Sequence, residues 1–148
     1  MSLIRTLKQH KLLLDTHIWI WLMSGDKVFK PSFLGFLGAR KDKTMTSISP
    51  ISIWEVGVLV EKNRIQLEMD RLEWVESALE YSGFEVEAIS PRIAVQSSRL
   101  PGDVHGDPAD RLLISTAHEK NYVLVTCDQK ILRYGKDRYI DVYNPCKS

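Results

Sequence analysis

The stretch that decides the fold lies in the last third of the chain, where residues 107–114 read DPADRLLI and residues 122–128 read YVLVTCD. The first segment opens a helix with an acid and a proline, and the second is a short apolar strand that ends on an acid. Residues 12–15 (LLLD) repeat the strand-then-acid pattern near the N-terminus. In a parallel sheet, acids at these positions meet along one edge, where sites usually form.

Strand and helix patterns alternate over most of the sequence. Short apolar or β-branched runs predict strands over residues 11–15, 44–49, 84–89, 122–126 and 139–143. The segments between them predict helices over residues 16–23, 27–42, 50–62, 69–81, 91–100 and 108–120. We therefore expect a single α/β domain over residues 1–148, with a mostly parallel central sheet flanked by helices. Its core runs from about residue 12 to residue 143 after a short polar lead-in over residues 1–10.

Composition narrows the class of protein. The 148 residues are 44% hydrophobic and 26% charged, as in ordinary globular domains, and a net charge of +1 gives no overall basic field for nucleic acid. No apolar run approaches the roughly 20 residues that span a bilayer, so we expect a cytoplasmic protein with no membrane partner. Cys127 and Cys146 have no metal-ligand spacing, and in that compartment we interpret them as two incidental thiols.

Four of the acids have an ordinary structural role available when each is taken alone. Asp15 and Asp107 suit helix N-caps, because each precedes a predicted helix. Asp110 suits the first turn of a helix, where the macrodipole stabilises a negative charge, and Asp128 suits the start of a turn.

Glu55 is harder to explain as a structural residue. It lies within the predicted helix over residues 50–62, which is apolar nearly all round and is therefore expected to be well buried. A carboxylate there loses hydration and needs a partner. Arg64, Arg111 or a bound cation could each be the partner of the Glu55 carboxylate.

The acids make a stronger case together than singly. In a parallel sheet the carboxylates can meet with two nearby hydroxyls at one edge, and the set comprises Asp15, Glu55, Asp110, Asp128, Thr16 and Thr126. An all-oxygen set of this kind suits Mg²⁺ or Mn²⁺, and Mg²⁺ is usually held directly by only one or two carboxylates. Such a site activates water for phosphodiester hydrolysis. Without a cation, crowded carboxylates should raise some of one another's pKa values.

Two other classes of α/β protein with acids at strand ends are excluded. A response-regulator receiver needs an acidic pair at the first strand and a lysine after the last one. A haloacid-dehalogenase-type phosphatase needs a second aspartate two residues after the first. Thr16 and His17 follow Asp15, and no suitable lysine closes the last strand.

Four segments in order, LLLDTHIWIW, TSISPISIWEVGVL, DPADRLLISTA and LVTCDQKI, resemble the PIN domain and specifically the VapC-type toxins of bacterial toxin–antitoxin pairs. The resemblance covers about residues 12–143. The interval between Asp110 and Asp128 also resembles the usual separation of the corresponding acids in the family. It implies a metal-dependent endoribonuclease that cleaves single-stranded or loop RNA. It also implies a homodimer that is held silent by a cognate antitoxin, whose tail lies across the active-site groove.

The resemblance also assigns roles to residues. The four acids of the family, as metal ligands and catalytic residues, are matched by Asp15, Glu55, Asp110 and Asp128. Thr126 matches a hydroxyl that often accompanies the fourth acid, and Thr16 and Asp107 are accessory. Arg111 matches a basic residue that contacts phosphate or pairs with a carboxylate. Because no acid is missing, a non-catalytic PIN-fold module that binds RNA or protein is the less favoured alternative.

The tryptophans raise the idea of base stacking. Their spacing nevertheless fits packing in the core or at an interface for most of the four, which are Trp19, Trp21, Trp54 and Trp74.

Overall fold

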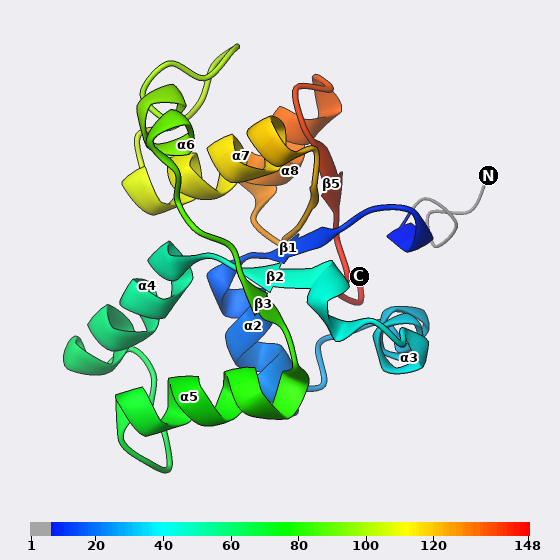
Figure 1. Ribbon diagram of the computed structural model, residues 1–148, viewed down its shortest axis with the longest axis vertical. Coiled ribbons are helices and arrows are strands. Elements are labelled where there is room, and N and C mark those ends of the chain that lie inside the picture. The colour runs from blue at the N-terminus through cyan, green and yellow to red at the C-terminus, as the bar shows by residue number, and fades with distance from the viewer. Residues whose placement is uncertain (1–6) are drawn as a thin grey trace.

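A computed structural model of the chain describes residues 7–148 and has an α/β architecture with a five-stranded parallel sheet (Figure 1). The strands are β1 (Leu12–Leu14), β2 (Thr46–Ile48), β3 (Glu85–Val86), β4 (Val123–Val125) and β5 (Asp141–Tyr143). Their order is β3-β2-β1-β4-β5, and every pairing is parallel. The predicted fold class is confirmed. Of the expected lead-in, residues 1–6 lie outside the described residues, and Leu7 is buried in the core.

Helices cover both faces of the sheet. They are α2 (Thr16–Met23), α3 (Pro31–Ala39), α4 (Pro50–Glu61), α5 (Arg71–Ser82), α6 (Pro91–Gln96), α7 (Pro108–Lys120) and α8 (Gln129–Lys136), and a short 3-10 helix (Lys43–Met45) precedes β2. In Figure 1, α7 and α8 lie on one side of the sheet, and α2, α3 and α5 lie on the other. No helix within residues 7–148 is long and apolar enough to cross a membrane.

The central strands are buried on both faces, which explains their unbroken apolar sequences. Leu12 and Leu14 of β1 pack into the core on the α2 side, while Leu13 packs with α7 and α8. Leu124 of β4 faces the same way as Leu13. All four leucines are fully buried.

Most helices begin where capping residues predict. The side chains of Asp15, Ser49 and Asp107 accept hydrogen bonds from backbone N–H groups in the first turns of α2, α4 and α7. Proline occupies the first position of α4 and α7, where its missing N–H costs nothing. Gly83 ends α5 with a left-handed φ of 74°, a conformation that glycine adopts without strain.

Three helices differ from prediction. α6 ends at Gln96 with Ser97 as its C-cap, before the predicted end at residue 100. α3 is shorter than the predicted segment 27–42, because Phe29 pairs with Cys146 in an antiparallel bridge and Pro31 begins the helix. α8 was not predicted. Asp128, which suited a turn, instead caps α8 by accepting from the N–H groups of Lys130 and Ile131.

The expectation that α4 is well buried was wrong. Only Ser52 and Val56 of this helix are buried, and Trp54 is 59% exposed. α4 packs on α2, α5 and α7. Ile51, Ile53 and Leu59 are partly buried against the core, while Trp54 and Val58 line open surface cavities. One face of this apolar helix therefore packs on the protein, and the other lines solvent-open cavities.

Candidate active site

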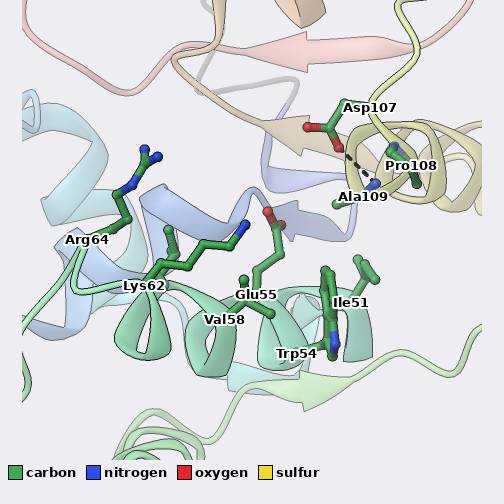
Figure 2. Close-up of a pocket in the computed structure, with 10 residues that line it drawn as sticks. Ile51, Trp54, Glu55, Val58, Lys62, Arg64, Asp107, Pro108 and Ala109 are labelled. Carbon is green, nitrogen blue, oxygen red and sulfur yellow. Dashed lines mark hydrogen bonds between the residues drawn. The ribbon is translucent and has the colours of Figure 1, made fainter.

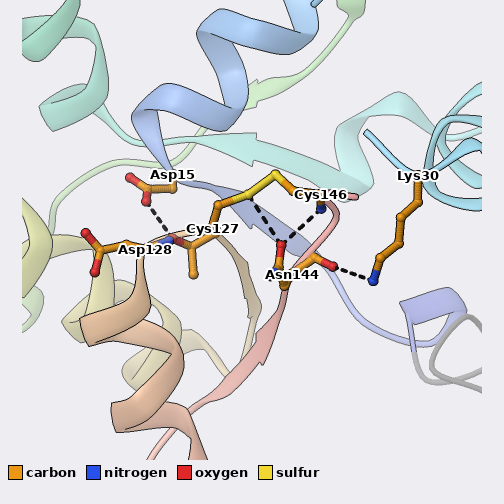
Figure 3. The surroundings of a disulfide bond; sticks show 7 residues. Asp15, Lys30, Cys127, Asp128, Asn144 and Cys146 are labelled. Carbon is orange, nitrogen blue, oxygen red and sulfur yellow. Dashed lines mark hydrogen bonds between the residues drawn. A yellow bond between two sulfur atoms is a disulfide. The ribbon is translucent and has the colours of Figure 1, made fainter. Parts of the chain in front are cut away.

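The first and fourth acids lie side by side at the carboxyl ends of two neighbouring strands. Asp15 follows β1 and Asp128 follows β4, and the N–H of Asp15 donates to Val125 O at 2.9 Å. The chain runs from β1 to β2 on one side and from β4 to β5 on the other, and the ends of two such neighbouring strands form a crevice where ligands usually bind. Figure 3 shows both carboxylates on the same side of the sheet edge.

Hydrogen bonds fix the carboxylate of Asp15. Its Oδ1 accepts from the N–H of Thr16 at 2.7 Å, and its Oδ2 accepts from the buried hydroxyl of Thr126 at 2.6 Å. The Thr126 oxygen also accepts from the N–H of Asp128 at 3.0 Å. Burial raises the pKa of Asp15, and the hydrogen bonds from Thr126 and Thr16 oppose that rise.

Glu55 reaches the site from α4 and is held by the hydroxyl of Thr16. Thr16 Oγ1 lies 2.6 Å from Glu55 Oε1 and 2.8 Å from Ser52 Oγ. Because Thr16 has one hydroxyl proton, it donates to the carboxylate and accepts from Ser52. Within residues 7–148 neither Arg64 nor Arg111 forms an ion pair with Glu55, so the partner of Glu55 is this hydroxyl.

Asp110 lies in the first turn of α7 and contacts a histidine. His105 Nε2 is 2.6 Å from Asp110 Oδ2, and the two side chains are 21% and 18% exposed. His105 was not singled out from the sequence, although it stands in the loop directly before the acids of α7. Burial raises the pKa of Asp110 to about 6, the His105 hydrogen bond opposes the rise, and Asp15 is among the nearby acids that add to it.

The pKa of Glu55 is also raised, first by burial and then by nearby acids. The prediction that some of the acids have raised pKa values is therefore confirmed in direction. Repulsion between carboxylates contributes, but loss of hydration is the larger cause at Asp15, Glu55 and Asp110.

Two accessory residues shape α7 and its preceding loop. Asp107 Oδ1 caps the helix by accepting from the N–H groups of Ala109 at 2.9 Å and Asp110 at 3.2 Å. The guanidinium of Arg111 donates to the backbone oxygens of Ser97, Val104 and His105. Arg111 therefore holds the loop that carries the histidine.

The donor set fits a hard divalent cation bound partly through water. Among residues 7–148, no three His, Cys, Asp or Glu side chains are gathered as a ready-made metal cluster. Asp128 uses Oδ1 to cap α8, and within the described chain its Oδ2 accepts no hydrogen bond. Carboxylate oxygens in this arrangement suit Mg²⁺ or Mn²⁺ held by one or two direct ligands and several waters.

Three surface cavities surround the acids. The largest, about 540 Å³, has Glu55 of α4 and its C-cap Lys62 facing Asp107, the N-cap of α7, as Figure 2 shows. A second, about 320 Å³, adjoins Asp15 and Asp128. A third, about 360 Å³, is lined by charged and aromatic side chains that include His105, Lys130 and Arg133. Basic groups therefore stand on both sides of an acidic centre.

Three of the four tryptophans confirm the packing prediction, since Trp21 and Trp74 pack against the core that contains Trp19. Trp19 is fully buried, and its ring meets that of Trp74 edge to face at 5.2 Å. Trp21 is half-buried beside the second cavity, and Trp54 is exposed on α4.

Cys127 and Cys146 form a disulfide, so the interpretation as incidental thiols was wrong (Figure 3). The reason is topological: β5 pairs with β4, and the segment after β5 turns back beside the residue that follows β4. Asn144 Oδ1 lies 3.3 Å from Cys127 Sγ and accepts from the N–H of Cys146 at 3.0 Å. The bond ties the C-terminal segment to the residue immediately before Asp128.

Comparisons with known proteins agree with this geometry. The family model described as the PIN domain matches residues 12–137. Ribonuclease VapC22 of Mycobacterium tuberculosis (strain ATCC 25618 / H37Rv) is 30% identical over 133 residues, which are 88% of this chain and 97% of that protein.

Solved structures share the fold. A toxin–antitoxin complex from Klebsiella pneumoniae contains a chain with a TM-score of 0.62 and 23% identity, covering 93% of this chain and 99% of that one. VapBC2 from Rickettsia felis, bound to a DNA fragment from its promoter, contains a chain with a TM-score of 0.64 and 18% identity, covering 90% and 97%. The family match spans most of the sequence and both crevice-forming strands. The chain belongs to the PIN-domain family.

Proposed function

We propose that the protein is a metal-dependent endoribonuclease that cleaves single-stranded or loop RNA and acts as the toxin of a toxin–antitoxin pair. The observation that carries this proposal is the meeting of acids from distant parts of the sequence. Asp15 and Asp128 follow adjacent strands. The negative charge of Asp15 lies close enough to Glu55 and Asp110 to raise the pKa of each. Similarity to Ribonuclease VapC22 over nearly the whole chain supports RNA as the substrate.

In this proposal Asp15, Glu55, Asp110 and Asp128 would hold Mg²⁺ or Mn²⁺, one or two of them directly and the others through water. The bound cation supplies an activated water and stabilises charge on the phosphate. Thr126 orients Asp15 and Thr16 orients Glu55 through the hydrogen bonds already described. The Glu55 carboxylate, oriented by Thr16, would accept the proton that the attacking water loses.

Basic side chains give the RNA backbone a path past the acids. Lys62 and Arg64 line the largest cavity beside Glu55, and Lys130 and Arg133 line the cavity beyond His105. Lysine and arginine contacts to phosphate oxygens position a nucleic acid without reading its sequence. Each cavity also contains two acids, Glu55 and Asp107 in the first and Asp103 and Asp137 in the second, so these bases act as local phosphate contacts and not through a net positive field.

Partners follow from the relatives. The Klebsiella pneumoniae structure is named a toxin–antitoxin complex, and by this likeness we propose a cognate antitoxin for the present chain. We also propose a homodimer, as the family resemblance implies, and a cytoplasmic location, where RNA substrates and an antitoxin would be met. Sedimentation of the purified chain with and without its antitoxin measures both assembly states.

The test uses purified protein freed of any partner, labelled structured RNAs, and buffers with Mg²⁺, Mn²⁺ or a chelator. We expect cleavage only with a cation, and a loss of about 100-fold or more in Asp15→Asn and Asp110→Asn, since each removes a charged ligand. Asp26→Asn is the matched control, because this exposed residue follows the opposite end of α2. Absence of cleavage by the wild type, or undiminished cleavage in both site variants, contradicts the proposal. RNA that is bound but not cut supports the non-catalytic alternative.

A further inference from the structure

The cavity beside Asp15 and Asp128 has two chemically different walls. The two carboxylates form one wall, and the other wall is aromatic and apolar, formed by His17, Ile18 and Trp21. Cys127, held in its disulfide, completes the lining. The cavity is about 320 Å³ and open to solvent, a size at the small end for ligand sites.

His17 and Trp21 form a preorganised aromatic pair. They are one turn apart on α2, which places them on the same helix face. Their ring centroids are 5.6 Å apart and their planes are tilted by 52°, so the two rings contact a ligand from different directions. Trp21 is half-buried, with part of its surface packed against the core. His17 is exposed, although Thr16 and Ile18 on either side of it are buried. The pair therefore presents one anchored ring and one solvent-facing ring to a ligand.

A flat aromatic ligand suits these walls better than a phosphate or a charged group. Two carboxylates repel an anion that lacks a cation, whereas ring faces and an aliphatic side chain bind an apolar, planar group. Nucleobases stack on aromatic side chains whatever their sequence, because every base has a π-face. A base can enter only when it is unpaired, as in single strands and loops.

We infer that this cavity binds one unpaired nucleobase next to the phosphate at the acids, with His17 and Trp21 as its stacking surface. The inference rests on the proposed function and deepens it, since the cavity shares Asp15 and Asp128 with the acidic centre. A nucleotide whose phosphate lies at these carboxylates brings a neighbouring base to the adjoining wall. His17 and Trp21 are then substrate-positioning residues that select single-stranded RNA.

Binding measurements test the inference without relying on cleavage. The Asp110→Asn protein is titrated, with Mg²⁺, into fluorescein-labelled uridine octamers, and fluorescence anisotropy reports the Kd. A series of octamers carries one abasic nucleotide at successive positions. We expect one position at which loss of the base weakens binding by about fivefold or more, the low end for one stacked base. Adding His17→Ala should weaken binding to the intact octamer similarly, and should abolish the difference between intact and abasic RNA.

Further variants separate stacking from folding. Trp21→Phe keeps an aromatic face and should retain most of the affinity, whereas Trp21→Leu should lose it, with circular dichroism reporting that both variants are folded. Tyr81→Ala is the matched control, because Tyr81 is 89% exposed on α5 and lines none of the three cavities around the acids. In the cleaving protein, His17→Ala should raise KM with little change in kcat.

The outcomes distinguish this inference from the proposed function. An abasic penalty that is the same with and without His17→Ala overturns the base site, even when the wild type cleaves RNA. Coupling between His17 and one base upholds the site even when no cleavage is found, and then the nuclease proposal alone fails. The inference is also overturned if the octamers do not bind at all. It is likewise overturned if removing a base at any position leaves the Kd unchanged.

Discussion

The hydroxyl of Thr126 donates to Asp15 Oδ2 at 2.6 Å and so joins two residues that are 111 positions apart in the sequence. The same oxygen accepts the backbone N–H of Asp128 at 3.0 Å. One buried hydroxyl therefore sets the orientation of the first acid and the backbone position of the last. It does so at the seam between β1 and β4, where the two strand ends meet.

Thr126→Val tests this link, because valine keeps the shape of threonine and removes its hydroxyl. We expect the affinity for Mn²⁺ to fall by about 10- to 100-fold, as for other residues that orient metal ligands. Unfolding should become easier by about 1 to 3 kcal/mol, since the N–H of Asp128 loses its acceptor. Thr126→Ser retains the hydroxyl and should restore both properties. Calorimetric Mn²⁺ titration and urea unfolding measure them, and unchanged Mn²⁺ binding in the valine variant would contradict the assigned role.

The pKa of Asp110, raised by burial to about 6, makes cation binding depend on pH. The charged form of Asp110 binds the cation and predominates above pH 6, so affinity should be high at pH 7.5 and should weaken as pH falls through 6. At pH 6, binding should release a proton from Asp110. Titrations in two buffers with different ionisation enthalpies count the protons released. A Kd that is constant between pH 7.5 and 5 would rule out Asp110 as a ligand.

Neutralising Asp110 should stabilise the cation-free fold. A carboxyl whose pKa is raised in the folded state destabilises the protein above that pKa, and the penalty is relieved as pH falls through 6 towards the unfolded value of 3.8. Asp110→Asn removes the penalty and keeps an oxygen that can accept from His105. After allowance for solvent screening we expect a gain of about 1 kcal/mol at pH 7.5, or about 2 to 4 °C in Tm.

Thermal melts in a chelating buffer measure this gain. It should shrink at pH 4.5, where the wild-type carboxyl is already mostly protonated, and Asp26→Asn should show no gain at either pH. A clear loss of Tm in Asp110→Asn at pH 7.5 would assign Asp110 a structural role instead.

Reduction of the disulfide should loosen the site as well as the fold. Opening the bond between Cys127 and Cys146 frees a loop with a sequence separation of 19, for which chain entropy gives about 3 kcal/mol. Dithiothreitol should therefore lower Tm by roughly 6 to 12 °C, at about 2 to 4 °C per kcal/mol. The Cys127→Ser and Cys146→Ser double variant should have the lower Tm, and dithiothreitol should not change that Tm. A melt that reductant leaves unchanged in the wild type would show that the bond does not form in the purified protein.

Local sequence signals were sufficient for much of the fold. The apolar runs of β1 and β4 and the capping residues Ser49 and Asp107 act within a few positions of themselves, so their elements were predicted closely. α8 was missed because its residues (QKILRYGK) form a short, polar segment with few buried side chains. The exposure of α4 was missed because an apolar pattern predicts burial without saying what buries the helix. In the structure the core covers only one face of α4.

The candidate site was predicted as a set of acids but not as a set of contacts. Parallel strands bring their carboxyl ends to one edge, so Asp15 and Asp128 could be placed on the same edge of the sheet from the sequence, and the structure adds that β1 and β4 are neighbours. The partnership of His105 with Asp110 depends on a loop whose path is held by Arg111, and no local pattern reveals such a path. Cys127 and Cys146 meet for a similar reason, because their approach requires the pairing of β4 with β5.

The central position of β1 has a consequence for the order of events during synthesis. β1 leaves the ribosome among the first elements, but its neighbour β4 and the acid that follows it are made only in the last third of the chain. Until then β1 has one open edge and Asp15 lacks both Thr126 and Asp128. The pair of acids that the proposed nuclease function requires is therefore assembled only once the last third of the chain has been made and has folded onto its first strand.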